Sequence, residues 1–199
     1  MRNIITILFT IISSVSALAQ GLVNDFNELD DCDLIFHVPA EGNNITEVTS
    51  GDGTIKADHV AVFFRVADVP LIIDATYRGV CVRRADSLTA EKGTCVFVRV
   101  KGVERKETIK NLMSFLGRPY DYKFYADDSE IYCSELVQKS FVGVDGSFIF
   151  KTIPMSFHDS KGKVTEYWKE YYRRRWNIPV PEGEEGTNPA DIYKQTLLL

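Results

Sequence analysis

The sequence predicts one α+β domain, in which a sheet of short strands comes first and helices follow. Three observations predict it: β-prone runs in the first half of the chain, helical spacing of apolar residues in the second half, and an ordinary globular composition. The 199 residues are 45% hydrophobic and 26% charged, close to the average of soluble domains. This length and composition exclude a disordered, collagen-like or disulfide-dense chain.

Five apolar, β-prone runs separated by turn residues predict the strands. They cover residues 33–38, 59–64, 71–76, 79–82 and 94–100. The polar segment 41–52 contains several Gly and Asn residues, which predicts a loop between the first two strands. The short gaps between the strands favour an antiparallel meander.

The helical half begins with Ile109, Leu112, Met113 and Leu116, which follow the i, i+3, i+4, i+7 spacing of one helix face. Gly117 and Pro119 are expected to end this helix. Further helices are predicted from near Cys133 to Phe141 and from about Val164 to Trp176, and the Pro- and Gly-containing tail from Pro179 is followed by a short segment from Ala190. Segregation of the helices from the strands makes the fold class α+β.

The helix predicted over 164–176 is rich in Tyr, Trp and Arg. Its arginines either contact an anionic substrate or form the solvated face of an amphipathic helix. The whole chain carries 28 acidic and 23 basic side chains, a net charge of −5. Because phosphate binding needs concentrated positive charge, we expect no nucleic-acid partner.

The first nineteen residues have the features of a secretory signal peptide. Arg2 is followed by an apolar run from Ile4 to Ile12 and by Ala17-Leu18-Ala19, a small-residue cleavage site. The run is short for a membrane span, which needs about 20 apolar residues. We therefore expect an exported chain, periplasmic or secreted, with one domain over 20–199 and no membrane span after cleavage.

One cysteine, one histidine and one carboxylate predict a thiol-based active site. Cys133 lies at the expected start of a helix, where free backbone N–H groups favour a thiolate and offer donors to an oxyanion. His59 opens a strand, and Asp74 ends the next one. Antiparallel pairing of these strands would bring Asp74 beside His59, where a carboxylate orients the imidazole. The alternative is that Asp74 only caps a strand end.

The other cysteines suggest structural roles. Cys32 lies between Asp31 and Asp33, which disfavour a thiolate. If Cys133 stays free, at most one internal disulfide remains, and Cys81 with Cys95 is the expected pair. The sequence has no CxxC, HExxH, GxSxG, P-loop or GxGxxG motif, so we expect neither a metal nor a cofactor.

Six motifs in a fixed order carry a family resemblance. They are DLIF (33–36), DHVAVF (58–63), IIDAT (72–76), GRPYDYKF (117–124), IYCSELV (131–137) and EGTNPADIY (185–193). In this order they resemble the circularly permuted papain-like thiol hydrolases related to the NlpC peptidoglycan endopeptidases, the YiiX/YebB-like group. The resemblance implies a permuted papain-like fold, in which the His strand precedes the Cys helix.

The resemblance also implies roles for individual residues. Cys133 matches the nucleophile and His59 the general base. Asp74 matches the third polar residue, although the family often has Glu there. Tyr120 and Asp121 match a pair near the pocket, and with Tyr132 they are expected to contact substrate or oxyanion.

The function expected from this resemblance is an exported cysteine hydrolase that cleaves amide bonds through a thioester. Its expected substrates are peptidoglycan stem peptides or their fragments. Two alternatives stay open. One is an acyl-lipid or N-acyl hydrolase or acyltransferase of the lecithin retinol acyltransferase-like kind, with Phe63, Phe64, Phe124 and Tyr125 lining an acyl groove. The other is an inactive binding module.

Overall fold

The computed structural model describes residues 26–49, 55–125 and 127–199. The predicted signal peptide, residues 1–19, lies outside them. The sheet has five antiparallel strands in the order β4-β3-β2-β1-β5. Their bounds are β1 (Leu34–Pro39), β2 (His59–Val66), β3 (Val69–Thr76), β4 (Gly79–Arg84) and β5 (Gly93–Val98).

The meander prediction is correct for four strands and wrong for the fifth. Strands β1 to β4 pair in sequence order, whereas β5 pairs with β1 at the other edge of the sheet. The short helix α2 (Asp86–Thr89), which contacts both β4 and β5, lies between these edge strands in the sequence. The residues of a segment predict that it forms a strand but not which strand it pairs with, and this explains why the position of β5 was predicted wrongly.

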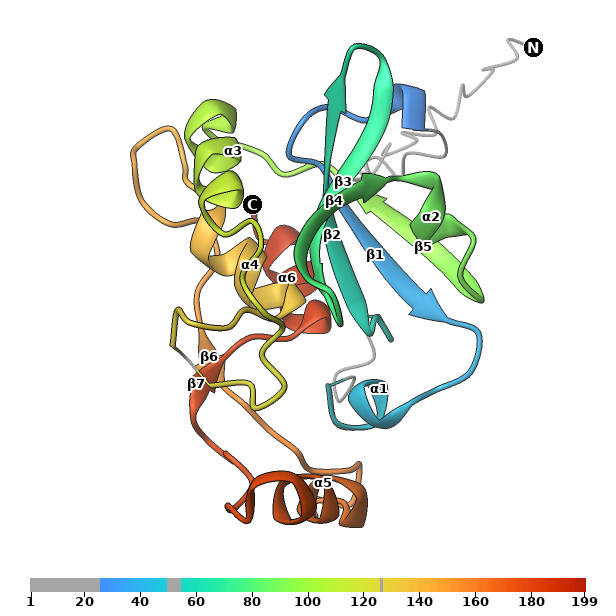
Figure 1. The fold of residues 1–199 in the computed structure, drawn as a ribbon, viewed down its shortest axis with the longest axis vertical. Coiled ribbons are helices and arrows are strands. Elements are labelled where there is room, and N and C mark those ends of the chain that lie inside the picture. The colour runs from blue at the N-terminus through green and yellow to red at the C-terminus, as the bar shows by residue number, and fades with distance from the viewer. Residues whose placement is uncertain (1–25, 50–54, 126) are drawn as a thin grey trace, which may run out of the picture.

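Both faces of the sheet are covered, because its central strands are apolar on both sides. Along β2, Val60 and Val62 belong to the core cluster that includes helix α4 (Cys133–Ser140), while Ala61 and Phe63 belong to the cluster under α2. Figure 1 shows helices α3 (Arg105–Ser114), α4 and α6 (Pro189–Thr196) together on one side of the sheet. This packing fixes the start of α4 against β2 and β3.

The three predicted helices are confirmed as α3, α4 and α5 (Glu166–Trp176), and the short segment from Ala190 lies in a further helix, α6. The loop predicted over 41–52 is wrong in part, because it contains α1 (Asn44–Thr49). Asn43 Oδ1 accepts the backbone N–H groups of Ile45 and Thr46 at 3.0 Å each, which starts this short helix. The remaining elements are η1 (Phe26–Glu28) and a two-stranded sheet of β6 (Ile153–Pro154) and β7 (Glu185–Gly186).

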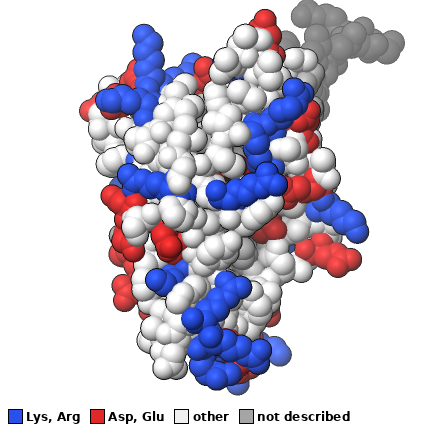
Figure 2. Space-filling view, viewed as in Figure 1, with Lys and Arg blue, Asp and Glu red and all other residues white. Residues whose placement is uncertain are grey.

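The helix α5 lies at one end of the molecule, with α1 between it and the sheet (Figure 1). Basic side chains gather over this end (Figure 2). Glu170 pairs with Arg173 at 2.7 Å and with Arg174 at 2.6 Å, while Trp168 and Tyr172 on the same helix are buried. Helix α5 is therefore amphipathic, and its charged face is solvated and ion-paired.

All four cysteines lie in the described part of the chain, and each is a free thiol. The expected disulfide between Cys81 and Cys95 is therefore wrong. These residues belong to β4 and β5, the two opposite edge strands, which do not pair with each other.

Among the described residues, no helix is both long and apolar enough to cross a membrane.

Candidate active site

Cys133 is the first residue of α4 and is only 4% exposed. The preceding residue, Tyr132, is extended (φ −101°, ψ 167°), so the helix begins sharply at the cysteine. The Tyr132 backbone N–H donates to Glu135 Oε2 at 3.4 Å, which ties the first turn back to the entering chain. The first N–H groups of a helix have no partner inside it, so they remain donors beside the thiol.

His59 lies at the start of β2, between the two neighbours predicted for it. Nε2 is 2.8 Å from Asp74 Oδ2, and the Cys133 side chain lies close enough to the imidazole to raise its pKa. Because β2 and β3 pair antiparallel, Asp74 at the end of β3 returns to the start of β2. The structure thus brings together Cys133, His59 and Asp74, which are far apart in the sequence.

The electrostatics of this cluster favour a charged pair. Burial alone would lower the pKa of His59, but the Cys133 thiolate and the hydrogen bond to Asp74 outweigh it and raise the pKa to about 10. Burial raises the pKa of Asp74, whose side chain is 0% exposed, yet bonds from His59 and Arg83 bring that pKa below its usual value. The arrangement suits an imidazolium that lies between the Asp74 carboxylate and the Cys133 side chain.

Arg83 is a neighbour of this cluster that the sequence reasoning missed. Its Nη2 lies 2.6 Å from Asp74 Oδ2. The predicted strand ended at residue 82, whereas β4 continues to Arg84 and carries Arg83 to the carboxylate. In the pairing of β3 with β4, Asp74 lies opposite Cys81 and Ile72 lies opposite Arg83. Arg83 is therefore a diagonal neighbour of Asp74 on the same face of the sheet, and this register was the available signal.

The other thiols differ from Cys133. Burial, together with the nearby Asp31 carboxylate, raises the pKa of Cys32 to about 12, so the disfavoured thiolate predicted there is confirmed. Burial also raises the pKa of Cys95. Neither thiol lines the cavity at Cys133 described next.

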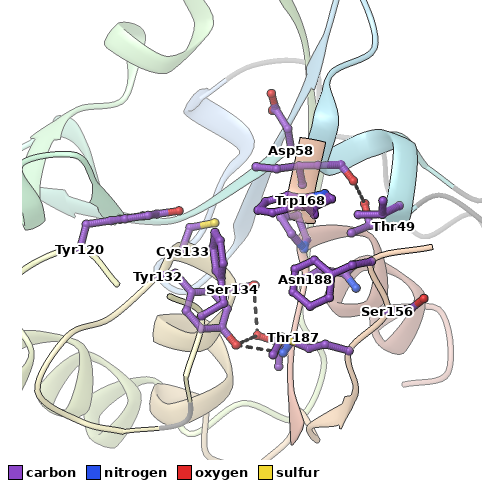
Figure 3. A pocket seen from close by; sticks show the side chains of 16 residues that line it. Thr49, Asp58, Tyr120, Tyr132, Cys133, Ser134, Ser156, Trp168, Thr187 and Asn188 are labelled. Atoms are coloured by element: carbon purple, nitrogen blue, oxygen red, sulfur yellow. Dashed lines mark hydrogen bonds between the residues drawn. The ribbon is translucent and has the colours of Figure 1, made fainter. Parts of the chain in front are cut away.

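An apolar cavity opens beside Cys133 and is shown in Figure 3. Most of its wall is aromatic or aliphatic: Ile45, Val48, Phe124, Tyr132, Met155, Phe157, Trp168 and Pro189. A polar groove lies beside His59 and includes Thr76, Tyr77, Arg78, Arg83, Ser87 and Glu91. Asp58 and Tyr120 line both spaces, so these two residues mark the boundary between them.

Tyr120 lies where the resemblance implied. Its hydroxyl points toward the Cys133 sulfur in Figure 3. Burial and the nearby Cys133 thiolate raise the pKa of Tyr120 well above its ordinary value, which keeps the phenol protonated and able to donate.

Tyr132 and Asp121 have contacts of other kinds. Tyr132 lines the cavity, but its hydroxyl accepts the Thr187 backbone N–H at 3.0 Å and so anchors the C-terminal segment against α4. Asp121 is 3% exposed, and its carboxylate accepts the N–H groups of Lys123 (2.7 Å) and Tyr125 (2.6 Å). Asp121 therefore shapes its loop and is not among the residues that line the cavity or the groove.

The acyl groove considered from the sequence is only partly present. Phe124 lines the cavity at Cys133, whereas Phe63 and Phe64 lie in the two core clusters and Tyr125 lies elsewhere on the surface. The cavity also contains Thr187 and Asn188, which the sequence reasoning gave no role. They belong to the EGTNPADIY motif, so the motif was the available signal.

The fold is similar to a solved structure, described as the metalloprotein YiiX from Escherichia coli O157:H7. The TM-score is 0.68 at 20% sequence identity, over 82% of this chain and 91% of that chain. In residues 26–49, 55–125 and 127–199, no three His, Cys, Asp or Glu side chains are grouped so as to hold a metal ion. We therefore assign no residue of this chain to a metal.

Sequence comparison gives two further matches. The chain is 34% identical over 97 residues to the "Uncharacterized protein YiiX" of Escherichia coli K12; the match spans about half of each chain, 46% of this one and 47% of that one. Residues 29–198 match the family model described as permuted papain-like amidase enzyme, YaeF/YiiX, C92 family. Because the match spans nearly all the described residues, the chain belongs to this family of permuted papain-like amidases.

Proposed function

We propose that this protein is a cysteine amidase in which Cys133 is the nucleophile, His59 the general base and acid, and Asp74 the orienting carboxylate. The observation that carries the proposal is the placement of these three side chains. Asp74 Oδ2 lies 2.8 Å from His59 Nε2, and the thiol at the first residue of α4 lies close enough to His59 to raise the pKa of the imidazole. Membership of an amidase family supports the reaction class.

In the proposed first half-reaction, His59 accepts the Cys133 proton at Nδ1, because Nε2 bonds Asp74. The sulfur adds to the amide carbonyl carbon, and the carbonyl oxygen becomes negative. Backbone N–H groups of the first turn of α4 and the Tyr120 hydroxyl would donate to this oxygen. His59 then protonates the amine nitrogen, the C–N bond breaks, and a thioester remains on Cys133.

In the second half-reaction, His59 removes a proton from water while the oxygen attacks the thioester carbonyl. The C–S bond breaks, the carboxylic acid leaves, and the proton returns to sulfur. Asp74 stabilises the imidazolium that exists between these transfers.

The two spaces beside the cluster suggest which part of a substrate lies where. The acyl group stays attached to Cys133, so it occupies the apolar cavity that contains the thiol. The amine is protonated by His59, so it leaves through the polar groove. Among the substrate classes that the sequence left open, this arrangement favours an N-acyl amide with an apolar acyl group and a polar amine.

Peptidoglycan stem peptides are the second candidate. The groove beside His59 carries Arg78 and Glu91, exposed groups of both signs that suit a charged peptide as the leaving amine. The acyl side of such a peptide is polar and suits the aromatic cavity less well.

The test uses the protein without its leader and three substrate classes: long-chain N-acyl amino acids, muropeptides, and phospholipid vesicles. Products are identified by mass spectrometry. We expect amide cleavage by the wild type and by Cys95→Ala, a matched control at a thiol outside the cavity, and none by Cys133→Ala. Cleavage by Cys133→Ala, or of phospholipid ester bonds alone, would contradict the proposal. Binding of all classes without products would instead indicate a binding module.

We also propose that the chain is exported, because the leader features of residues 1–19 are followed by the whole domain.

A further inference from the structure

Arg83 bonds both oxygens of the buried Asp74 carboxylate. Its Nε lies 3.2 Å from Oδ1 and 3.1 Å from Oδ2, and Nη2 lies 2.6 Å from Oδ2. The same Oδ2 is 2.8 Å from His59 Nε2. A buried carboxylate is stable only when it is paired and hydrogen-bonded, and here Arg83 and the imidazole together meet that need.

The guanidinium of Arg83 is itself held in place. Nη1 donates to Ser87 Oγ at 2.9 Å and lies 3.5 Å from Glu91 Oε1. Ser87 belongs to α2, and Glu91 follows that helix, so the segment between β4 and β5 fixes the far side of the arginine. A planar guanidinium bonded on both sides has little freedom to turn, which makes its direction toward Asp74 well defined.

We propose that Arg83 is a positioning residue of the amidase site: it keeps Asp74 ionised and its Oδ2 directed at His59, so that the imidazolium–thiolate pair with Cys133 persists in mildly acidic solution. This inference rests on the proposed roles of Cys133, His59 and Asp74. It assigns a fourth residue to the cluster and links the α2 segment to the reacting groups.

The charges around Asp74 determine what the loss of Arg83 does. The charged groups that bond Asp74 are His59 from β2 and Arg83 from β4, and Cys81 lies opposite it in the register. Glu91 after α2 faces Arg83, and Cys133 from α4 faces His59. Without Arg83, Asp74 keeps His59 as its cationic partner but takes up a proton at a higher pH. The neutral acid no longer stabilises the imidazolium, and the thiolate is lost with it.

This reasoning confines the effect to acidic solution. At neutral and alkaline pH, Asp74 stays ionised without Arg83, and the imidazolium keeps its partner. A merely structural role for Arg83 would instead lower the reactivity of Cys133 by the same factor at every pH.

The experiment measures the alkylation rate of Cys133 by iodoacetamide from about pH 4 to pH 9, read by mass spectrometry of the peptide that contains it. We expect the pH of half-maximal rate to rise by about one unit in Arg83→Gln. Arg83→Lys keeps the charge and should stay close to the wild type. Arg84→Gln is the matched control, because Arg84 pairs with Asp86 on the surface and is 63% exposed; its profile should not change.

An unchanged half-maximal pH in folded Arg83→Gln would overturn the inference, and so would an equal shift in Arg83→Lys. If Arg83→Gln does not fold, Arg83→Met makes the same test with an apolar side chain of similar length. Alkylation needs no amide substrate. Failure of the amidase assay therefore does not affect the alkylation test. An unshifted pH profile of Cys133 alkylation, in turn, does not contradict the amidase proposal.

Discussion

His37 and His59 lie opposite each other on the neighbouring strands β1 and β2, and each imidazole bonds a different carboxylate. His37 Nδ1 lies 2.8 Å from Asp58 Oδ1, whereas His59 Nε2 lies 2.8 Å from Asp74 Oδ2. His59 also lies near Cys133, which raises the pKa of its imidazole, while His37 Nε2 is buried without a hydrogen-bond partner. The two residues therefore offer a matched comparison of the proposed general base and a histidine outside the proposed reaction.

His59→Ala is expected to lower kcat on an N-acyl amide by about a thousandfold or more, because the thiol loses its base. His37→Ala should keep most of kcat but lower the free energy of unfolding by about 2 kcal/mol, since Asp58 loses a buried partner. Steady-state kinetics and urea denaturation measure the two effects. Equal losses of kcat in both variants would show that the comparison is wrong.

Cys133 and Asp74, the partners that raise the pKa of His59, should make stability depend on pH. The pKa of His59 is about 10 in the folded chain against an ordinary 6.5, so the folded state binds the proton more tightly. Its stabilisation is fully present below pH 6.5 and is lost as the pH rises toward 10. We expect the difference in free energy of unfolding between wild type and Asp74→Asn to shrink across this range in urea titrations. A difference that grows with pH would contradict the charged pair.

Tyr120→Phe tests the proposed oxyanion donor. Removing one such donor costs about 100- to 1,000-fold in kcat, so we expect a loss of this size with little change in KM. The alkylation rate of Cys133 should stay near the wild-type rate, because the thiol and its base are intact. Tyr122→Phe is the control, since this neighbouring ring lies 4.9 Å from Tyr120 and lines the groove beside His59 but not the cavity that contains Cys133. Similar kinetics in both variants would remove Tyr120 from the mechanism.

Val48→Phe tests the acyl cavity. Val48 lies on α1 and lines the cavity, so a larger ring should fill space that a long acyl chain needs. We expect kcat/KM to fall about tenfold or more for long-chain N-acyl amides and little for N-acetyl amides, because a few lost methylene contacts are worth about that much. Glu47→Gln, an exposed neighbour on the same helix, is the control. An equal loss on short and long chains would argue against acyl binding there.

Export predicts the mass of the mature protein. If the leader is cleaved after Ala19, the exported chain begins at Gln20, and intact-mass measurement of a periplasmic or secreted fraction will show this. Replacing Ala17 and Ala19 with larger residues should block cleavage and leave the longer mass. Full-length protein confined to the cytoplasm would reject export.

The sequence by itself determined the five strands of the main sheet, the longer helices and the candidate site residues. Apolar, β-prone runs bounded by turn residues predicted the strands, and helical spacing of apolar residues predicted α3, because these patterns follow from local backbone geometry. A cysteine at a helix start and a histidine and aspartate on consecutive strands were enough to place Cys133, His59 and Asp74 together. The permuted order of the motifs indicated the family before any contact was known.

Only the tertiary structure decided which distant segments complete the site. Pairing of β5 with β1 separates Cys81 from Cys95, and the full length of β4 brings Arg83 to Asp74. The apolar cavity joins α1 to α5 and to the segment before α6. Sheet order and the packing of irregular segments depend on contacts between residues far apart in the chain, and local sequence patterns carry no information about those contacts.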